Sequence, residues 1–219
     1  MTESRPSIKE LIFIPSVITL VITVLRLAGE LQNWAPSLFS RAAGGGGSLI
    51  GISWLILVFG AWFGWRLTRM GHGASSPLKV SGLAFVVGLV VSLASFGMGK
   101  VAGQNGLFAA LILGSIVAIL LTRTLWPALW QTLLAYAFAA RIPVALLMLI
   151  AILGNWGTHY DVPPPGFPDT YSPFVKWFLI GFLPQMTIWI YMTVIGGLVT
   201  GGIAGAIAGR KNQGSPGSV

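Results

Sequence analysis

The sequence contains no cysteine, and charged side chains are scarce. Charged residues make up 8% of the 219 residues, whereas soluble domains carry about 25%. The absence of cysteine excludes disulfides, thiolate metal ligands and a thiol nucleophile. The chain has only two histidines, so a metal centre with three or four protein ligands has few donors to draw on. The sequence therefore indicates no metal site and no cofactor.

Catalytic motifs are also missing. There is no G-x-x-x-x-G-K-[ST] phosphate loop, no G-x-S-x-G nucleophile elbow and no H-E-x-x-H zinc motif. We assign no catalytic residue and expect a protein that is not an enzyme.

Apolar residues dominate the sequence. Hydrophobic side chains account for 55% of the residues, and the mean hydropathy is +0.83. The net charge of +8 comes from basic residues scattered at the ends of apolar runs. Nucleic-acid binding needs a clustered basic face, whereas scattered basic residues orient membrane proteins. We therefore predict that the lipid bilayer, and no nucleic acid, is the chain's environment.

The apolar runs predict an all-α, polytopic integral membrane bundle of about six transmembrane helices, because a span needs about 20 apolar residues. Residues 174–209 would be about 54 Å long as one helix, well beyond a hydrocarbon core of about 30 Å. We therefore expect 172–183 to be interfacial or re-entrant. The expected spans within a single domain, 1–209, are 8–29, 49–68, 80–99, 107–124, 127–152 and 184–209, followed by a disordered tail, 210–219.

Small residues recur at four-residue spacing on several of these helices. In lipid, such stripes allow helix backbones to approach closely. We expect a glycine zipper that packs helices of this chain, of a homo-oligomer or of other membrane subunits. The positions concerned are Gly197, Gly201, Gly205 and Gly209 on the last span, Gly106 and Gly114 on 107–124, and Gly88 on 80–99.

The run Gly44–Ser48 is a flexible coil by composition. Its sequence also matches a common engineered linker, so a native and an engineered origin both stay open.

Basic residues predict the orientation. With a cytoplasmic N-terminus and six spans, eight basic residues lie on the cytoplasmic side and four on the other, as the positive-inside rule requires. Both termini are then cytoplasmic and the 154–173 connection is extracytoplasmic. We expect a multi-pass protein of a bacterial inner membrane.

Arg141 is the one charge expected deep in a span, and an intramembrane ionisable residue usually faces a pathway. No acidic residue is expected deep in a span, which argues against a carboxylate proton relay. An anion path and a purely structural arginine both stay open. Further pathway or buried polar candidates are Tyr136, Gln131, Gln185 and Tyr191.

The 155–171 connection carries His159, Asp161 and Asp169. These residues fit a solvated loop, a catalytic or metal role, or partner recognition.

Three functions follow. The first, which we favour, is transport of a small polar or anionic solute through the bundle. The alternatives are a non-catalytic structural or assembly subunit of a membrane complex, and a membrane-embedded enzyme using the 155–171 loop.

Overall fold

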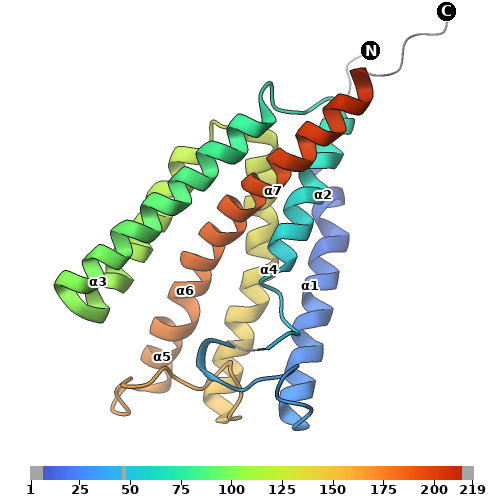
Figure 1. Cartoon of the computed structure of the whole chain (residues 1–219). Coiled ribbons are helices and arrows are strands. Elements are labelled where there is room, and N and C mark those ends of the chain that lie inside the picture. The colour runs from blue at the N-terminus through green and yellow to red at the C-terminus, as the bar shows by residue number, and fades with distance from the viewer. Residues whose placement is uncertain (1–6, 46–47, 214–219) are drawn as a thin grey trace, which may run out of the picture.

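The chain folds into helices joined by irregular connections, with no strand among the residues that the structure describes (Figure 1). This computed structural model describes residues 7–45 and 48–213. Its elements are α1 (Ile8–Leu31), η1 (Ala43–Gly45), α2 (Leu55–Arg69), α3 (Pro77–Thr122), α4 (Pro127–Gly154), α5 (Pro173–Lys176), η2 (Trp177–Phe182), α6 (Leu183–Met186) and α7 (Ile188–Gln213).

Four helical stretches of the described chain are long and apolar enough to cross a membrane. They are α1, α3, α4 and the stretch Pro173–Arg210. The helical membrane bundle is thus supported, whereas six spans stay a prediction. The predicted tail is wrong in part, because α7 continues through 210–213; residues 214–219 lie outside the described part.

The predicted span 49–68 is shorter than expected, because α2 has only 15 residues. Residues just before it bond to a neighbouring loop. The Leu49 amide donates to the Ser37 carbonyl at 3.2 Å, and the Ile50 amide donates to the Leu38 carbonyl at 3.2 Å. These bonds hold residues 49–50 in a non-helical conformation, so α2 begins only at Leu55.

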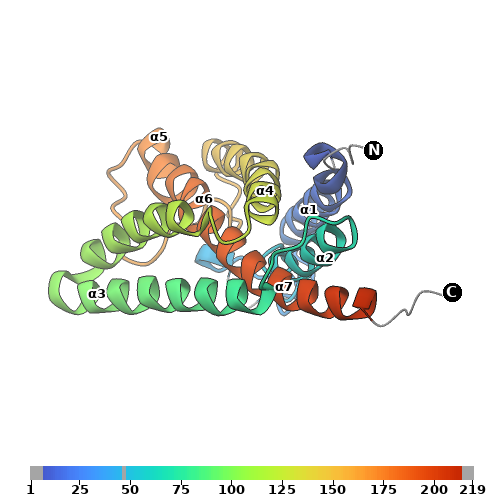
Figure 2. The ribbon, with the colours of Figure 1, turned by 90° about the horizontal axis from the view of Figure 1, so that it is seen from above.

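The predicted spans 80–99 and 107–124 form a single hairpin, α3. Its helical path breaks at Ala102 and at Gly103, which has φ 65° and ψ −160°. Only glycine adopts such a conformation readily. Two arms therefore lie side by side and project to one side of the bundle (Figure 2).

The C-terminal helical stretch runs diagonally across the bundle from α5 to α7 (Figure 1). Pro184 lacks the amide that a regular helix would use, and the π-type segment η2 directly precedes its turn. A second disturbance follows at Thr187, with φ −122° and ψ −75°. Trp177 Nε1 donates to the Ala145 carbonyl at 2.8 Å and so ties η2 to α4. The interfacial or re-entrant placement of 172–183 stays a prediction.

Glycines set how closely α7 approaches α2 and α4. A methyl group on Gly201 would lie 2.6 Å from Leu129 Cδ2 and 2.8 Å from the Gly60 carbonyl oxygen. One on Gly64 would overlap the Gly201 carbonyl. Gly197 faces the Leu133 side chain in the same way. Glycines of α2 thus face glycines of α7, and the backbones nearly touch.

The other candidate glycines differ in their surroundings. A methyl on Gly205 would lie 2.9 Å from Trp126, one on Gly114 3.0 Å from Val91 of the opposite α3 arm, and one on Gly88 3.2 Å from Ile195. Gly106 is crowded by Ala102, at 2.6 Å, whereas Gly209 has nothing within 4 Å. The crowded positions are filled by this chain, so they leave no free docking face. Oligomer and subunit partners stay predictions.

Gly201→Ile is expected to destabilise the bundle by about 1–3 kcal/mol, because the branched side chain overpacks the contact with Leu129 and Gly60. Gly209→Ile is the matched control on the same helix, where the site is open. Thermal unfolding in detergent compares the two. Equal stability of Gly201→Ile and wild type would contradict this packing.

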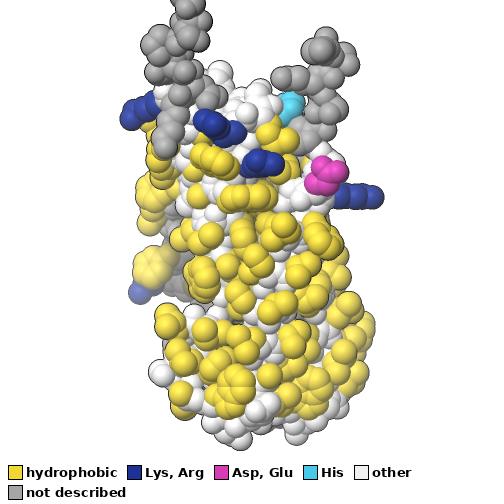
Figure 3. Space-filling view, turned by 90° about the vertical axis from the view of Figure 1, so that its right-hand side faces the viewer, with side chains coloured by type: hydrophobic (Ala, Val, Ile, Leu, Met, Phe, Trp, Pro, Cys, Tyr) yellow, Lys and Arg dark blue, Asp and Glu magenta, His cyan; other side chains and the backbone are white. Residues whose placement is uncertain are grey.

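On the face drawn in Figure 3, apolar side chains cover much of the middle and lower part, and most of the basic side chains lie toward the upper end. Exposed apolar side chains of the bundle include Phe13 of α1, 67% exposed, and Phe85 of α3, 61% exposed. Such a surface suits hydrocarbon and not water. The structure therefore supports a membrane location.

Candidate functional site

A cavity of about 320 Å³ lies between α1, α4 and the α5–α7 stretch. Its wall includes residues of the two connections 32–54 and 155–172, at the end of the bundle that we call the loop end (Figure 1). The polar and charged side chains in the wall are Thr23, Arg26, Ser53, Arg141, His159, Tyr160 and Gln185. Apolar side chains, among them Phe108 of α3, complete the wall.

Arg141 lies in this wall at mid-length of α4. It is only 3% exposed, and its guanidinium carbon lies 4.6 Å from the centre of the Trp189 ring. That distance is in the range of a cation–π contact. Its Nε has no hydrogen-bond partner among the described residues. The cavity wall thus contains a buried cation with one unpaired hydrogen-bond donor.

Gln185 lies in the same wall, from α6. Its amide nitrogen is 3.8 Å from the sulfur of Met148, a weak acceptor. Its carbonyl oxygen has no partner among the residues described. Arg141 and Gln185 therefore place an unpaired donor and an unpaired acceptor in residues of the cavity wall.

The other pathway candidates lie elsewhere. Tyr136 is 2.7 Å from Thr19 Oγ1 and packs edge-on against Phe59 and Phe63 in the core. Tyr191 donates to the Gly88 carbonyl of α3 at 3.2 Å. Gln131 is exposed beside a second hollow at the opposite end of α4. The structure gives these three side chains structural or surface positions.

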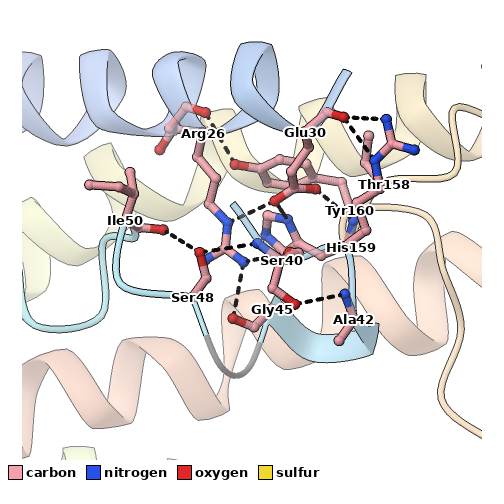
Figure 4. A network of polar contacts seen from close by, with 12 residues as sticks. Arg26, Glu30, Ser40, Ala42, Gly45, Ser48, Ile50, Thr158, His159 and Tyr160 are labelled. Atoms are coloured by element: carbon pink, nitrogen blue, oxygen red, sulfur yellow. Dashed lines mark hydrogen bonds and ion pairs between the residues drawn. The ribbon is translucent and has the colours of Figure 1, made fainter. Parts of the chain in front are cut away.

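A buried ion pair lies at the loop end of the cavity. Arg26 Nε donates to Glu30 Oε1 at 2.8 Å, and the Glu30 side chain is fully buried (Figure 4). Arg26 Nη2 also donates to the carbonyls of Ser40, at 3.2 Å, and Gly45, at 3.0 Å. Arg41 Nε donates to the Glu30 carbonyl at 2.8 Å. The C-terminal end of α1 is thereby hydrogen-bonded to the 32–54 connection.

His159 completes this cluster. Its Nδ1 lies 2.5 Å from Glu30 Oε1, and its backbone amide donates to Glu30 Oε2 at 2.9 Å. Burial lowers the pKa of His159, and this effect outweighs the hydrogen bond to Glu30. The adjacent Tyr160, whose hydroxyl donates to the Thr23 carbonyl at 3.2 Å, has its pKa raised by burial. Figure 4 shows these groups converging from α1 and the 155–172 connection.

The two aspartates of this connection are not part of the cluster. Asp161 accepts from the amides of Gly157, at 2.8 Å, and Thr158, at 2.7 Å, and from the Thr158 hydroxyl at 2.6 Å. Asp161 therefore stabilises the turn formed by residues 157–161. Asp169 is exposed beside a separate shallow hollow. No group of three His, Cys, Asp or Glu side chains in the described chain is placed to hold a metal ion.

The glycine run contributes to the site. Gly45 has φ 71°, and a methyl there would lie 2.8 Å from His159 Cδ2 and 3.0 Å from Arg26 Nη2. Ser48 accepts from the Ser40 amide at 3.3 Å. Residues 46–47 lie outside the described residues. Gly45 therefore contacts the buried cluster, and Ser48 is bonded to Ser40, whose carbonyl accepts from Arg26.

The sequence prediction missed Glu30. The expected first span, 8–29, ends one residue before it, whereas the structure places Glu30 inside α1 and buries it. The available signal was its spacing from Arg26, because residues four apart face one another on a helix.

Comparisons with protein-family models, with curated proteins and with solved structures find no match.

Proposed function

We propose that the chain is a multi-pass membrane protein that transports a small polar or anionic solute through its bundle. The observation that carries the proposal is Arg141, whose buried guanidinium has an unpaired Nε and which lies in the wall of a cavity. Burying a cation without a counter-charge and with an unpaired donor costs free energy, so a functional use explains its position better than packing does. Arg26, in the same wall, adds a second cation whose charge Glu30 already balances.

The cavity supports a path in one half of the bundle. Its wall extends from His159 and Gly45 at the loop end to Arg141 and Trp189 at mid-length of α4. Anions would enter by the loop end and meet Arg141 near the middle of the membrane.

Purified protein in liposomes tests the proposal. The assay compares fluxes of chloride, nitrate, methanesulfonate and the cation choline with those of empty liposomes. Anion flux above that of empty liposomes, with choline excluded, supports it. Anion fluxes no higher than in empty liposomes would refute it.

We also propose the topology: a bacterial inner membrane, six spans with α2 and both α3 arms crossing, and both termini cytoplasmic. The loop end then lies outside. Because the chain has no cysteine, single cysteines can report each side. Asp169→Cys, at an exposed site, is expected to react with an impermeant maleimide in intact cells. Ser75→Cys, exposed at the other end, should react only after lysis; the reverse pattern would overturn the topology.

One observation favours the enzyme alternative. The carboxylate of Glu30 holds His159 Nδ1, as an orienting acid holds a general base. The liposome assay separates the two functions, because a transported solute is recovered unchanged and an enzyme's substrate is chemically converted.

A further inference from the structure

His159 is held at one ring nitrogen and can titrate at the other. Nδ1 lies 2.5 Å from Oε1 of Glu30, a carboxylate that Arg26 also contacts. Because that carboxylate is an acceptor, Nδ1 carries the hydrogen in the neutral ring. A methyl on Gly45 would lie 3.3 Å from Nε2, so Nε2 lies beside another residue of the cavity wall. Nε2 is therefore the atom that can take up a proton.

His159, Arg26 and Arg141 share this cavity of about 320 Å³. A methyl on Gly45 would lie 3.0 Å from Arg26 Nη2 and 3.3 Å from His159 Nε2, so a small anion beside the Arg26 guanidinium would lie close to the imidazole. Charges in a partly buried site interact more strongly than in bulk water. Anion binding and protonation of His159 are then coupled.

We propose that the cavity binds its anion together with a proton, and that Nε2 of His159 takes up that proton. This inference rests on the proposed function and adds a proton as the co-substrate of the anion.

The charges around His159 decide the sign of the coupling. Glu30 and Arg26 face it from α1, Arg41 bonds to the Glu30 carbonyl, Asp161 and Tyr160 lie on its own connection, and Arg141 lies across the cavity on α4. Without an anion, burial lowers the pKa of His159, Arg26 lowers it further, and the ring is neutral at neutral pH.

A bound anion raises the pKa of His159, because it favours the charged ring. Anion affinity should therefore increase as the pH falls from the His159 pKa of the anion-bound protein to that of the empty protein. Within this window the gain is up to tenfold per pH unit, and below it there is no further gain.

Calorimetric titration of the purified full chain with methanesulfonate tests the inference. This anion does not itself titrate where histidine does. In buffers of different protonation enthalpy, the wild type is expected to take up as much as one proton per anion. His159→Asn keeps an amide donor toward Glu30 but cannot titrate, so proton uptake and the pH dependence of binding should disappear. His72→Asn, which removes the chain's other histidine, is the matched control and should retain both.

The results separate this inference from the proposed function. Binding of methanesulfonate by the wild type without proton uptake, or an unchanged pH dependence in His159→Asn, would overturn the inference alone. No binding at any pH would overturn the anion site and the inference with it. The wild-type measurement needs no variant, so it decides even if His159→Asn does not fold.

Discussion

Replacing Arg141 by Met is expected to abolish anion flux in proteoliposomes and to weaken anion binding at least tenfold. A hydrogen bond to a charged group is worth about 1.5–3 kcal/mol, and Met removes both the charge and the donors. The bundle should keep its stability or gain some, because an apolar side chain then replaces a buried cation whose Nε is unpaired. Thermal unfolding and flux, measured on the same preparation, check both expectations.

Arg141→Lys should retain part of the flux, since the charge remains while the planar donor fork and its stacking on Trp189 are lost. Gln131→Met is the control, because Gln131 lies on the same helix outside the cavity wall. Full flux in a stable Arg141→Met protein would show that the arginine is no functional site.

Glu30→Ala is expected to destabilise the protein by about 3–5 kcal/mol, because it leaves the buried guanidinium of Arg26 without its carboxylate. The same change removes the acceptor that holds the His159 amide and ring. Both long connections should therefore loosen together. Thermal unfolding measures the first effect, and proteolysis of the two connections measures the second.

Two variants serve as controls for Glu30→Ala. Glu30→Gln keeps acceptor capacity without the charge and should cost less. Asp169→Asn removes an exposed carboxylate and should change stability by no more than about 0.5 kcal/mol. If Glu30→Ala unfolds like wild type, the buried pair contributes nothing to the fold.

The helical membrane class could be predicted because it depends on the apolar composition of each segment, which can be read directly from the sequence. The start of α2 could not, because it depends on bonds to another part of the connection. Ser37 and Leu38 bond to the residues before α2 and shorten it, which does not follow from the hydropathy of that segment. The break of α3 at Gly103, by contrast, lies between the expected spans 80–99 and 107–124.

The site could be predicted only in part. Arg141 and Gln185 stood out as polar residues in apolar runs, and both line the cavity. His159 stood out as a rare residue, but its partner Glu30 is 129 positions away. Gly60 and Gly64 of α2 were not singled out, although they face the glycines of α7. Pairings between distant segments are set by the fold and leave no local pattern.

The i,i+4 placement of Arg26 and Glu30 also bears on how the chain enters the bilayer. Both residues belong to α1, so their charges compensate each other as soon as this helix forms. The first segment can therefore insert without waiting for a counter-charge from later segments. His159 follows α4 in the chain, so it can bond to Glu30 only after α4 has been made. By then the charges of Arg26 and Glu30 already compensate each other.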